Sequence, residues 1–555
     1  MQRLSLIHED ALRPIARVGE ALWLFSRQDG RLHALLPDGV RITSASGPLF
    51  IVPGDSEALC FHLNGNDRLE IERLMLTERG TVERSRSVVH RVPDSEDNQL
   101  SGLVASESGS RTVLLTTSDP SRTVGVEVGS GARRTIRHPE GMAVARILDS
   151  GALVLAGGGG YVVQHRDRDV HGTGTIVATT QEAALTREDS KDHRSFWLIE
   201  DGRRRPLHTP EGWSPLQAAF DVDGGVQMIC LHPEQGYGLW QVSQHSVHVL
   251  QGTAQLFPLE RASPVLRVVS AVHGSIWMNG PRRWPGAAAP CPDLSVERVQ
   301  IAGMPCILLT GSGPSPRSVV VAFHGGPDSH EWDDLRYGGS YRELIASGLD
   351  VLVVNYPGSA HLGVGLHSAA WQQWPRVATG SASAVAKFCR LRGYRDLIAF
   401  GVSFGAWFAA MSADELGAVG VVALSPILAM SPHLRLHSDR DPAFAEWAHK
   451  RFGPEYHSAA EGDDAVAQSR TRIVAIVPVD DEVVDASNAV PAEFRNVEAR
   501  SVPGHHYPRT LADADTRWAA LVRSIEEFAA RASDACLPQA ASGENRYPIP
   551  GSVSR

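Results

Sequence analysis

The first half of the chain is predicted to be β-sheet, because its apolar residues recur near period two. Each of several runs gives an apolar alternation, then a Gly, Asp, Ser or Pro turn, then a second strand; they cover 21–36, 111–128, 195–209 and 237–251. Convincing amphipathic helices are nearly absent from this half. The pattern therefore predicts an all-β domain.

A weak repeat runs through this β-rich half. Strands centred on a tryptophan occur at 22–25, 196–199 and 239–242, and each is followed by a polar turn and another β-run. A period of about 40 residues corresponds to one four-stranded propeller blade, so this half has room for about seven blades. We predict a β-propeller over residues 1–285, with another all-β sandwich or an irregular barrel as the alternative.

The pattern changes after a Pro-, Gly- and Ala-rich stretch at 280–294, which we interpret as a linker. Continuous apolar runs then alternate with helical stretches. The apolar runs lie at 318–323, 350–356, 397–402, 419–424 and 472–479, and the helical stretches at 340–347, 381–393, 406–417 and 516–533. Such alternation predicts an α/β domain over 286–533, with a mostly parallel sheet covered on both faces. Residues 534–555 lack apolar periodicity and are predicted to be a loosely ordered tail.

Charge and composition narrow the class of protein. The 555 residues carry a formal net charge of -10, with 43% hydrophobic and 21% charged residues. These values are typical of a globular protein, and the negative charge disfavours nonspecific binding to nucleic acid or to an anionic membrane. The sequence does not fix the oligomeric state, so a homo-oligomer stays open.

The cysteines and the N-terminal sequence indicate in which cellular compartment the protein is expected. The six cysteines are widely spaced and form no CxxC pair, which fits neither a disulfide framework nor a zinc site. Glu9 and Asp10 interrupt what would be the apolar region of a signal peptide, and no apolar run approaches the roughly 20 residues that span a bilayer. We therefore expect free thiols, no membrane association and a cytoplasmic location.

The strongest chemical signal is Gly401-Val402-Ser403-Phe404-Gly405. It lies directly between a predicted strand and a predicted helix, as a nucleophile elbow requires. The two glycines allow close backbone approach, and the serine is expected in a strained conformation. Ser403 is therefore the predicted nucleophile of an α/β-hydrolase domain; an ordinary strand-to-helix turn is the alternative.

A serine hydroxyl needs a base, and the base needs an orienting carboxylate. In this fold the chain order is serine, acid, histidine. Asp480 follows the predicted strand 472–479, with Asp481 and Asp485 as alternatives, and His505 lies in a turn before the last helix, with His506 as the alternative. A metal site built from these groups is disfavoured, because no helix-spaced ligand pair accompanies them. We expect neither a metal nor another cofactor.

The developing oxyanion needs preorganised donors. His324-Gly325-Gly326-Pro327 follows a predicted strand of the same sheet. The backbone N–H of Gly325 or Gly326 is one predicted donor and that of Phe404 is the other. A plain β-turn is the alternative for this tetrapeptide.

Five ordered motifs between about residues 295 and 530 resemble the prolyl oligopeptidase family of serine peptidases, which includes acylaminoacyl and dipeptidyl peptidases. The motifs are FHGGP (323–327), VLVVNYPGS (351–359), GVSFG (401–405), the D-x-x-V segment at 480–483 and GHHY (504–507). The resemblance implies a propeller that covers the active site and admits short or flexible peptides. Its D-x-x-V and Gly-His-x-aromatic frames select Asp480 and His505.

The chain departs from the family pattern near the substrate. Pro357 replaces the usual arginine of Asn-x-Arg-Gly-Ser, and no paired-glutamate motif for a peptide amino terminus is found in the β-rich half. Trp332, Trp371 and Trp407 are candidates for a specificity pocket, although core or domain-interface packing is the alternative for each.

These observations predict a serine peptidase that hydrolyses a small peptide substrate through an acyl-enzyme. An isopeptidase acting on a modified peptide, an esterase or thioesterase using the same triad, and a non-catalytic binding protein are the other hypotheses. Neither the preferred residue nor exo- versus endo-cleavage follows from the sequence.

Overall fold

A computed structural model of the chain describes residues 12–534 apart from short internal segments. The segments outside the description are 27–30, 37–38, 45–49, 54–56, 65–67, 92–102, 107–111, 117–120, 128–132, 140–141, 148–152, 158–159, 165–168, 181, 190–193, 260–261 and 314–316. Apart from Asp534, which ends a helix, the tail predicted at 534–555 lies outside the described residues.

The described strands up to Pro285 form seven four-stranded antiparallel sheets, each built from strands consecutive in the chain. The sheets are β1 (Leu12–Val18), β2 (Ala21–Ser26), β3 (Arg31–Leu36) and β4 (Gly39–Ser44); β5 (Phe50–Pro53), β6 (Glu57–Asn64), β7 (Arg68–Leu76) and β8 (Val82–Arg91); β9 (Leu103–Ser106), β10 (Thr112–Thr116), β11 (Arg122–Glu127) and β12 (Arg133–Arg137); β13 (Ala143–Ile147), β14 (Leu153–Gly157), β15 (Gly160–Gln164) and β16 (Asp169–Thr173); β17 (Thr175–Thr179), β18 (Ala183–Asp189), β19 (Arg194–Glu200) and β20 (Arg203–Leu207); β21 (Ser214–Phe220), β22 (Val226–His232), β23 (Gly236–Gln241) and β24 (Ser246–Val249); β25 (Thr253–Leu259), β26 (Ala262–Ser270), β27 (Gly274–Asn279) and β28 (Arg282–Pro285).

Each of these sheets contacts the next one along the chain, and the first also contacts the last. The first and last sheets are joined by Trp284 Nε1, which donates to the Glu20 carbonyl oxygen at 2.7 Å. Arg17 donates to Asn279 Oδ1 at 2.8 Å across the same junction. An apolar cluster with residues of both sheets, including the fully buried Trp277, lies between them. The two ends of the β-rich half are therefore held against each other.

The remaining strands form one eight-stranded mixed sheet in the order β29-β30-β32-β31-β33-β34-β35-β36. Their bounds are β29 (Leu294–Ile301), β30 (Met304–Gly311), β31 (Ser318–Phe323), β32 (Asp350–Val354), β33 (Asp396–Val402), β34 (Ala418–Leu424), β35 (Ile473–Pro478) and β36 (Val497–Val502). From β32 to β36 neighbouring strands are parallel, as predicted, whereas β29 and β30 pair antiparallel. The sequence pattern had not indicated those two antiparallel strands.

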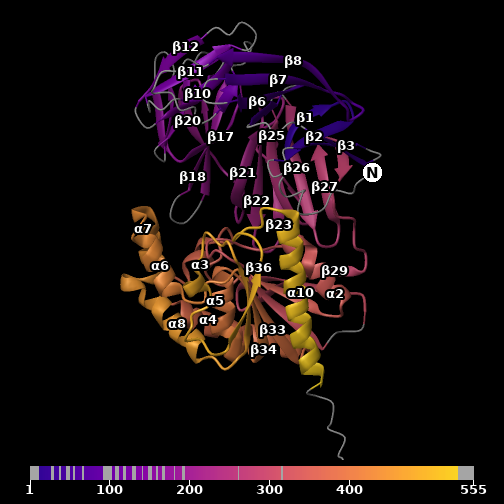
Figure 1. Cartoon of the computed structure of the whole chain (residues 1–555), viewed down its shortest axis with the longest axis vertical. Coiled ribbons are helices and arrows are strands. Elements are labelled where there is room, and N and C mark those ends of the chain that lie inside the picture. Colours follow the sequence, from indigo (N-terminus) through magenta and orange to yellow (C-terminus); the bar gives the residue numbers. More distant parts are fainter. Residues whose placement is uncertain are drawn as a thin grey trace, which may run out of the picture.

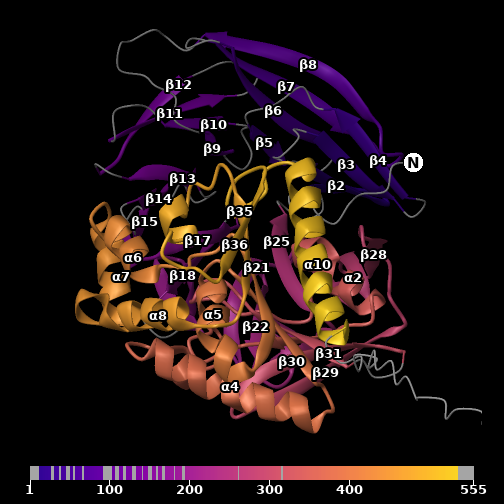
Figure 2. The ribbon, with the colours of Figure 1, turned by 60° about the horizontal axis from the view of Figure 1, so that its bottom comes forward.

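Helices cover both faces of this sheet. Their bounds are η1 (Tyr337–Gly339), α2 (Ser340–Ala346), α3 (Val364–Ser368), α4 (Trp374–Leu391), α5 (Phe404–Leu416), α6 (Met430–Ser438), α7 (Pro442–Phe452), η2 (Pro454–Tyr456), α8 (His457–Gln468), α9 (Ala486–Ala489) and α10 (Leu511–Asp534). Helices α4, α5 and α8 lie on one face, and α2 and α10 lie on the other (Figures 1 and 2).

Strand β31 shows why its sequence reads as a continuous apolar run. Val319, Val321 and Phe323 belong to the core beneath α4 and α5, whereas Val320 and Ala322 belong to the core beneath α2 and α10. Successive side chains of a strand point to opposite faces, so a strand covered on both sides has no polar position.

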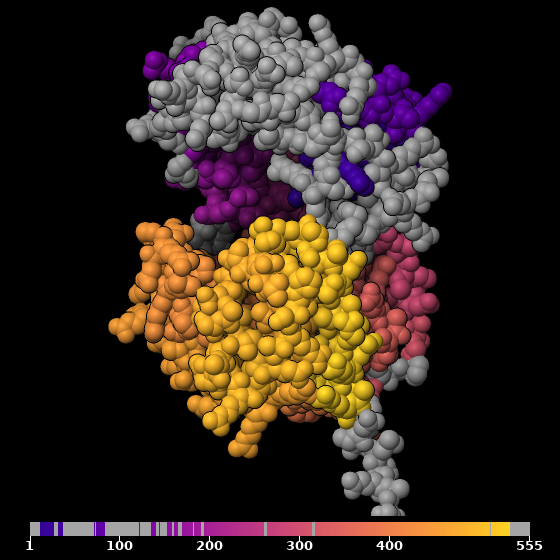
Figure 3. Space-filling view, viewed as in Figure 1, coloured from indigo at the N-terminus to yellow at the C-terminus, as the bar shows by residue number. Residues whose placement is uncertain are grey.

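The second of these cores continues into the β-rich half. It contains Ile229, Leu231 and Leu266 from the seven sheets together with Trp332 and Leu344 from the α/β part. Figure 3 shows the two parts stacked along the long axis of the molecule. Among the described residues, no helix is long and apolar enough to cross a membrane.

Candidate active site

Ser403 lies at the sharp turn between β33 and α5, with φ 54° and ψ -118°. A positive φ is unusual for a residue other than glycine, and such strain recurs at functional sites. A Cβ at Gly401 would lie 2.1 Å from the Gly405 carbonyl oxygen, and one at Gly405 would lie 2.2 Å from the Phe323 carbonyl oxygen. Both glycines are therefore required by the turn.

The Ser403 backbone is fixed by a hydrogen bond, whereas its hydroxyl group is left available to a ligand. Its amide donates to the Leu424 carbonyl oxygen at 2.9 Å, which ties the turn to the neighbouring strand β34. Its hydroxyl does not cap α5. The residue lines a cavity of about 580 Å³, on which His506 also lies.

The carboxylate–histidine pair at this cavity is Asp481 with His506. His506 Nδ1 donates to Asp481 Oδ2 at 2.8 Å and lies 3.1 Å from Oδ1. The side chains are only 3% and 7% exposed, so water competes little for this contact. With its proton on Nδ1, a neutral imidazole keeps a lone pair on Nε2, which is the form that a general base needs.

The predicted pairing of Asp480 with His505 is not formed. Asp480 is exposed, and its amide extends the pairing of β35 with β36 by donating to Gly504 O at 3.1 Å. His505 Nδ1 lies 3.2 Å from Glu482 Oε2, on the surface. Asp485 caps α9 by accepting from the Ser487 amide and hydroxyl. The geometry therefore supports the alternative in each case, one residue further along the chain.

A local turn explains why Asp481, and not Asp480, is aimed inward. Asp481 Oδ1 accepts from the amides of Val483 at 2.9 Å and Val484 at 2.8 Å. A carboxylate that bonds amides two and three residues ahead folds the chain back over itself. The segment Asp481-Glu482-Val483-Val484 also fits D-x-x-V, so the sequence contained a second frame that pointed to the observed pair.

Arg517 of α10 stabilises the turn that contains His505 and His506, which is called the histidine turn below. The residue is 1% exposed and lines the same cavity. Its guanidinium donates to the carbonyl oxygens of His505 and His506 and approaches Ser425 Oγ at 3.4 Å. Sequence reasoning missed this residue, because a lone arginine in a helix carries no motif.

The predicted oxyanion donors border Ser403. A Cβ at Gly325 would lie 3.5 Å from Ser403 Cβ, so this backbone passes directly beside the predicted nucleophile. Gly325, Gly326 and Phe404 all line the cavity with Ser403. No backbone partner is recorded for their three amides within the described part of the chain, which leaves them available to a ligand.

His324 fixes the glycine pair. It is fully buried, its Nδ1 donates to the Gly325 carbonyl oxygen at 2.7 Å, and its Nε2 is 2.7 Å from Ser359 Oγ. Burial lowers the pKa of His324 to about 3, so the ring is neutral. Because a trans peptide points its C=O and N–H in opposite directions, holding the Gly325 carbonyl also sets the direction of the Gly326 N–H.

The predicted pocket tryptophans do not line the cavity. Trp332 is 2% exposed and packs on Gly236 of the β-rich half, where a Cβ would lie 2.7 Å from the indole nitrogen. Trp407 is fully buried in the α/β core and donates to Asp463 Oδ1 at 3.0 Å. Trp371 stacks beneath the cation of Lys450. Packing, the stated alternative, is what the structure shows for Trp332 and Trp407.

An apolar wall is formed instead by one face of α6, one face of α7 and the turn after β35. Positions i, i+3 and i+4 of α6, and i and i+3 of α7, point to the same side of each helix. The cavity residues on these elements are Met430, His433, Leu434, Phe444, Trp447 and Val483.

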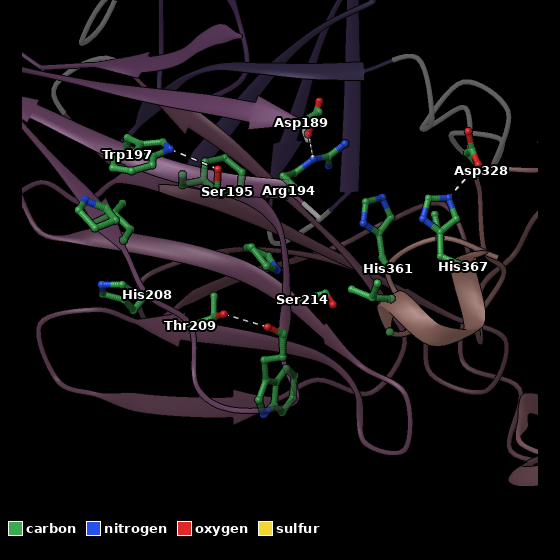
Figure 4. Close-up of a pocket in the computed structure, with 18 of the residues that line it drawn as sticks. Asp189, Arg194, Ser195, Trp197, His208, Thr209, Ser214, Asp328, His361 and His367 are labelled. Carbon is green, nitrogen blue, oxygen red and sulfur yellow. Dashed lines mark hydrogen bonds and ion pairs between the residues drawn. The ribbon is translucent and has the colours of Figure 1, made fainter. Parts of the chain in front are cut away.

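A second cavity, of about 810 Å³, lies between the β-rich half and the α/β part, and Trp447 borders both cavities. Figure 4 shows its β-rich side, with Arg194 paired to Asp189, facing His361 and His367 of the α/β part. The Trp447 side chain therefore stands at the boundary between this cavity and the one beside Ser403.

Asp328 connects three side chains at the boundary between these cavities. Its carboxylate accepts from His367 Nε2 at 2.8 Å, Trp447 Nε1 at 2.7 Å and Arg451 Nε at 3.0 Å. Burial alone would raise the pKa of Asp328, but the hydrogen bonds from His367 and Arg451 outweigh it and lower the pKa to about 2.

The loop that begins with the glycine pair continues into the contact with the seven sheets. Asp333 accepts from Ser270 Oγ at 2.9 Å and from the Ala271 amide at 2.7 Å. His330 Nε2 is 2.8 Å from Tyr237 Oη. One loop therefore connects the predicted oxyanion donors to the β-rich half. No group of three or more His, Cys, Asp or Glu side chains suited to a metal ion occurs among the described residues.

No family model matches the sequence, and no curated protein matches it. Solved structures do match over nearly the whole chain. An acylaminoacyl peptidase of Pyrococcus horikoshii is similar with a TM-score of 0.70 at 10% identity, covering 95% of this chain and 97% of its own. A puromycin-hydrolysing peptidase of Mycobacterium tuberculosis gives 0.63 at 16% identity, covering 96% of each chain.

A post-proline cleaving enzyme from Rickettsia typhi gives a TM-score of 0.61 at 11% identity, covering 94% of this chain and 92% of its own. At these identities the likeness concerns the fold. The predicted resemblance is confirmed at that level: the chain has the fold of the prolyl oligopeptidase family of serine peptidases.

Proposed function

We propose that this protein is a serine peptidase that hydrolyses short or modified peptides through an acyl-enzyme intermediate. The observation that carries the proposal is the buried Asp481–His506 pair on the same cavity as the strained Ser403. A nucleophile at an elbow, an imidazole with a free Nε2 and a carboxylate on its Nδ1 are the parts that acyl transfer needs.

Each residue has a role in this proposal. His506 removes the Ser403 proton as the hydroxyl attacks the carbonyl carbon, and then gives that proton to the leaving amine. Asp481 holds the tautomer and stabilises the imidazolium. The amide of Phe404, with that of Gly325 or Gly326, stabilises the oxyanion. Ser403 Oγ and His506 form no hydrogen bond in this structure, and catalytic contacts of this kind commonly tighten only when substrate binds.

The β-rich half, residues 1–285, is proposed to be a seven-bladed propeller over the catalytic domain, residues 286–533. Seven consecutive four-stranded sheets, with the first against the last, support a closed ring. Access through such a cover favours short or flexible peptides. The similar acylaminoacyl and puromycin-hydrolysing peptidases support a peptide or amide substrate.

The test is hydrolysis of matched aminoacyl amides, short peptides and simple esters, together with labelling by a fluorophosphonate. We expect the wild type to hydrolyse amides and to be labelled. The Ser403→Ala variant should not be labelled, and its turnover should be lower by about a million-fold. If the protein hydrolyses esters and its amide turnover is below about a thousandth of its ester turnover, it is an esterase or thioesterase and not a peptidase. Absence of labelling in the wild type would contradict a serine hydrolase altogether.

A further inference from the structure

The apolar wall beside Ser403 contains one polar group without a partner. His433 lies on the face of α6 that carries Met430 and Leu434, and it lines the cavity. It is 6% exposed, and its Nδ1 is a buried atom without a hydrogen-bond partner in the described structure. Nδ1 is enclosed, so a ligand in the cavity would reach the ring through Nε2, which has no hydrogen-bond partner in the described structure and is not one of its buried unpaired atoms. A polar ring nitrogen left unpaired in an apolar wall makes this group a candidate for contact with a ligand.

The next histidine of the same helix provides an internal contrast. His437 lies one turn further along α6 and packs against His433, with ring centroids 4.4 Å apart and the ring planes tilted by 50°. Its Nε2 donates to the Val483 carbonyl oxygen at 3.2 Å, and it does not line the cavity. The two rings share a helix face, yet only the one that reaches the cavity lacks a polar contact.

The protonation state of His433 narrows what it can recognise. Burial, with a smaller effect from His437, lowers the pKa of His433 to about 4, so the ring is neutral near pH 7. A neutral imidazole offers one N–H donor and one lone pair. A phenol hydroxyl can both donate and accept, so it matches the ring in either tautomer, whereas an indole N–H only donates and a phenyl ring does neither.

We propose that His433 makes the enzyme selective for a tyrosine-like residue, with its phenol hydroxyl bonded to this imidazole, next to the scissile bond. The proposal rests on the proposed peptidase function. Met430, Leu434 and Phe444 supply the apolar contacts for the ring of such a side chain, and His433 supplies the polar end. A site built to bond a hydroxyl rejects an analogue without it, because the protein group is then left unpaired.

The experiment compares kcat/KM for tyrosyl, phenylalanyl and tryptophanyl 7-amido-4-methylcoumarins, free and N-acetylated. In the wild type we expect tyrosine to exceed phenylalanine by about tenfold or more. In His433→Leu the ratio should fall to about one, because kcat/KM for tyrosine falls more than kcat/KM for phenylalanine. His437→Gln keeps a donor for the Val483 carbonyl and serves as the matched control, in which the ratio should stay as in the wild type.

A second measurement guards against a variant that fails to fold. Tyrosinamide and phenylalaninamide are compared as inhibitors of fluorophosphonate labelling of the wild type, where tyrosinamide should protect Ser403 at the lower concentration. Equal protection, a wild-type ratio near one, a preference for tryptophan, or a ratio unchanged in His433→Leu would each overturn the proposal. If the wild type is not labelled and hydrolyses no substrate, the proposed function has failed instead.

Discussion

The turn of the proposed nucleophile at 401–405 and the turns of the proposed acid and histidine at 479–507 are held in place by different interactions. The first is set by backbone sterics: Gly401 and Gly405 have no room for a Cβ, and the Ser403 amide is tied to β34. The second is set by polar side chains, with Asp481 on two amides and Arg517 on two carbonyls. Substitution of a glycine in the first region should therefore damage the fold, whereas substitutions in the second should damage catalysis.

A large effect that separates the two regions is expected for Asp481→Asn. Oδ1 already accepts from two amides, so the asparagine oxygen stays there and its NH₂ turns toward His506. That NH₂ would donate to Nδ1 and place the imidazole proton on Nε2, where it cannot accept from Ser403. We expect turnover to fall about ten-thousand-fold with the melting temperature nearly unchanged, measured by amide hydrolysis and calorimetry.

Asp480→Asn is the matched control for this change, because Asp480 is exposed and adjacent in sequence. It should leave turnover as in the wild type. The reverse result, with Asp480→Asn inactive and Asp481→Asn active, would show that the carboxylate has been assigned to the wrong residue.

This pair of aspartates also shows where sequence reasoning reached its limit. The elbow was predictable because G-x-S-x-G between a strand and a helix leaves one serine. The D-x-x-V frame fits both Asp480–Val483 and Asp481–Val484, and Gly-His-His leaves two imidazoles. Only the turn made by the Asp481 carboxylate decides between the two frames, and a side-chain hydrogen bond of that kind leaves no pattern in a single sequence.

The packing of individual strands and side chains was harder to predict than the acid and the histidine of the site. The continuous apolar runs identified β31 to β35 well, because strands covered on both faces are apolar throughout. Strand β29 was missed because its exposed positions break the apolar run. Strand β30 was missed although its first six residues are buried. The roles of Trp332, Trp407 and Trp447 depend on which elements lie across from them, and that is decided by tertiary structure.

Unlike the aspartate substitutions, substitution of a glycine in the elbow should lower the stability of the fold. A methyl group at Gly401 would lie 2.1 Å from the Gly405 carbonyl oxygen, so Gly401→Ala should destabilise the fold by about 3 kcal/mol or more. Chemical denaturation measures the change. Gly380→Ala in α4 is the control: a Cβ there meets nothing within 4 Å, and alanine should stabilise the helix by about 1 kcal/mol. Equal stability of both variants would contradict the steric account of the elbow.

Arg517 tests whether the histidine turn depends on the guanidinium behind it. Lysine has no fork with which to reach both carbonyls, so Arg517→Lys should lower kcat about ten- to a hundred-fold with little change in KM. Steady-state kinetics separate the two terms, and a melting curve reports the fold. A rise in KM at constant kcat would instead show that Arg517 binds substrate and does not position His506.

The smallest expected effect concerns pH and the support of the apolar wall. Asp463 accepts from the amides of Met430 and Ser431 at the start of α6 and from Trp407 Nε1. Burial raises the pKa of Asp463 to about 6, against 3.8 for an exposed group. Between these values the folded state binds a proton that the unfolded state lacks, so this group's contribution to stability is lost as pH rises through about 6.

The difference in melting temperature, Asp463→Asn minus wild type, should therefore increase from pH 4 to pH 7. Scanning calorimetry at several pH values measures it. A difference that stays constant over this window would contradict the raised pKa.

In the proposed mechanism, the imidazole that acts on Ser403 is the buried one of His506, paired to Asp481. It is tested most directly by the rate of fluorophosphonate labelling and of amide hydrolysis in His506→Ala and in His505→Ala. We expect His506→Ala to lose about a million-fold in amide turnover and to be labelled more slowly than His505→Ala, which should keep wild-type rates. Wild-type rates in His506→Ala, with the loss in His505→Ala, would contradict it.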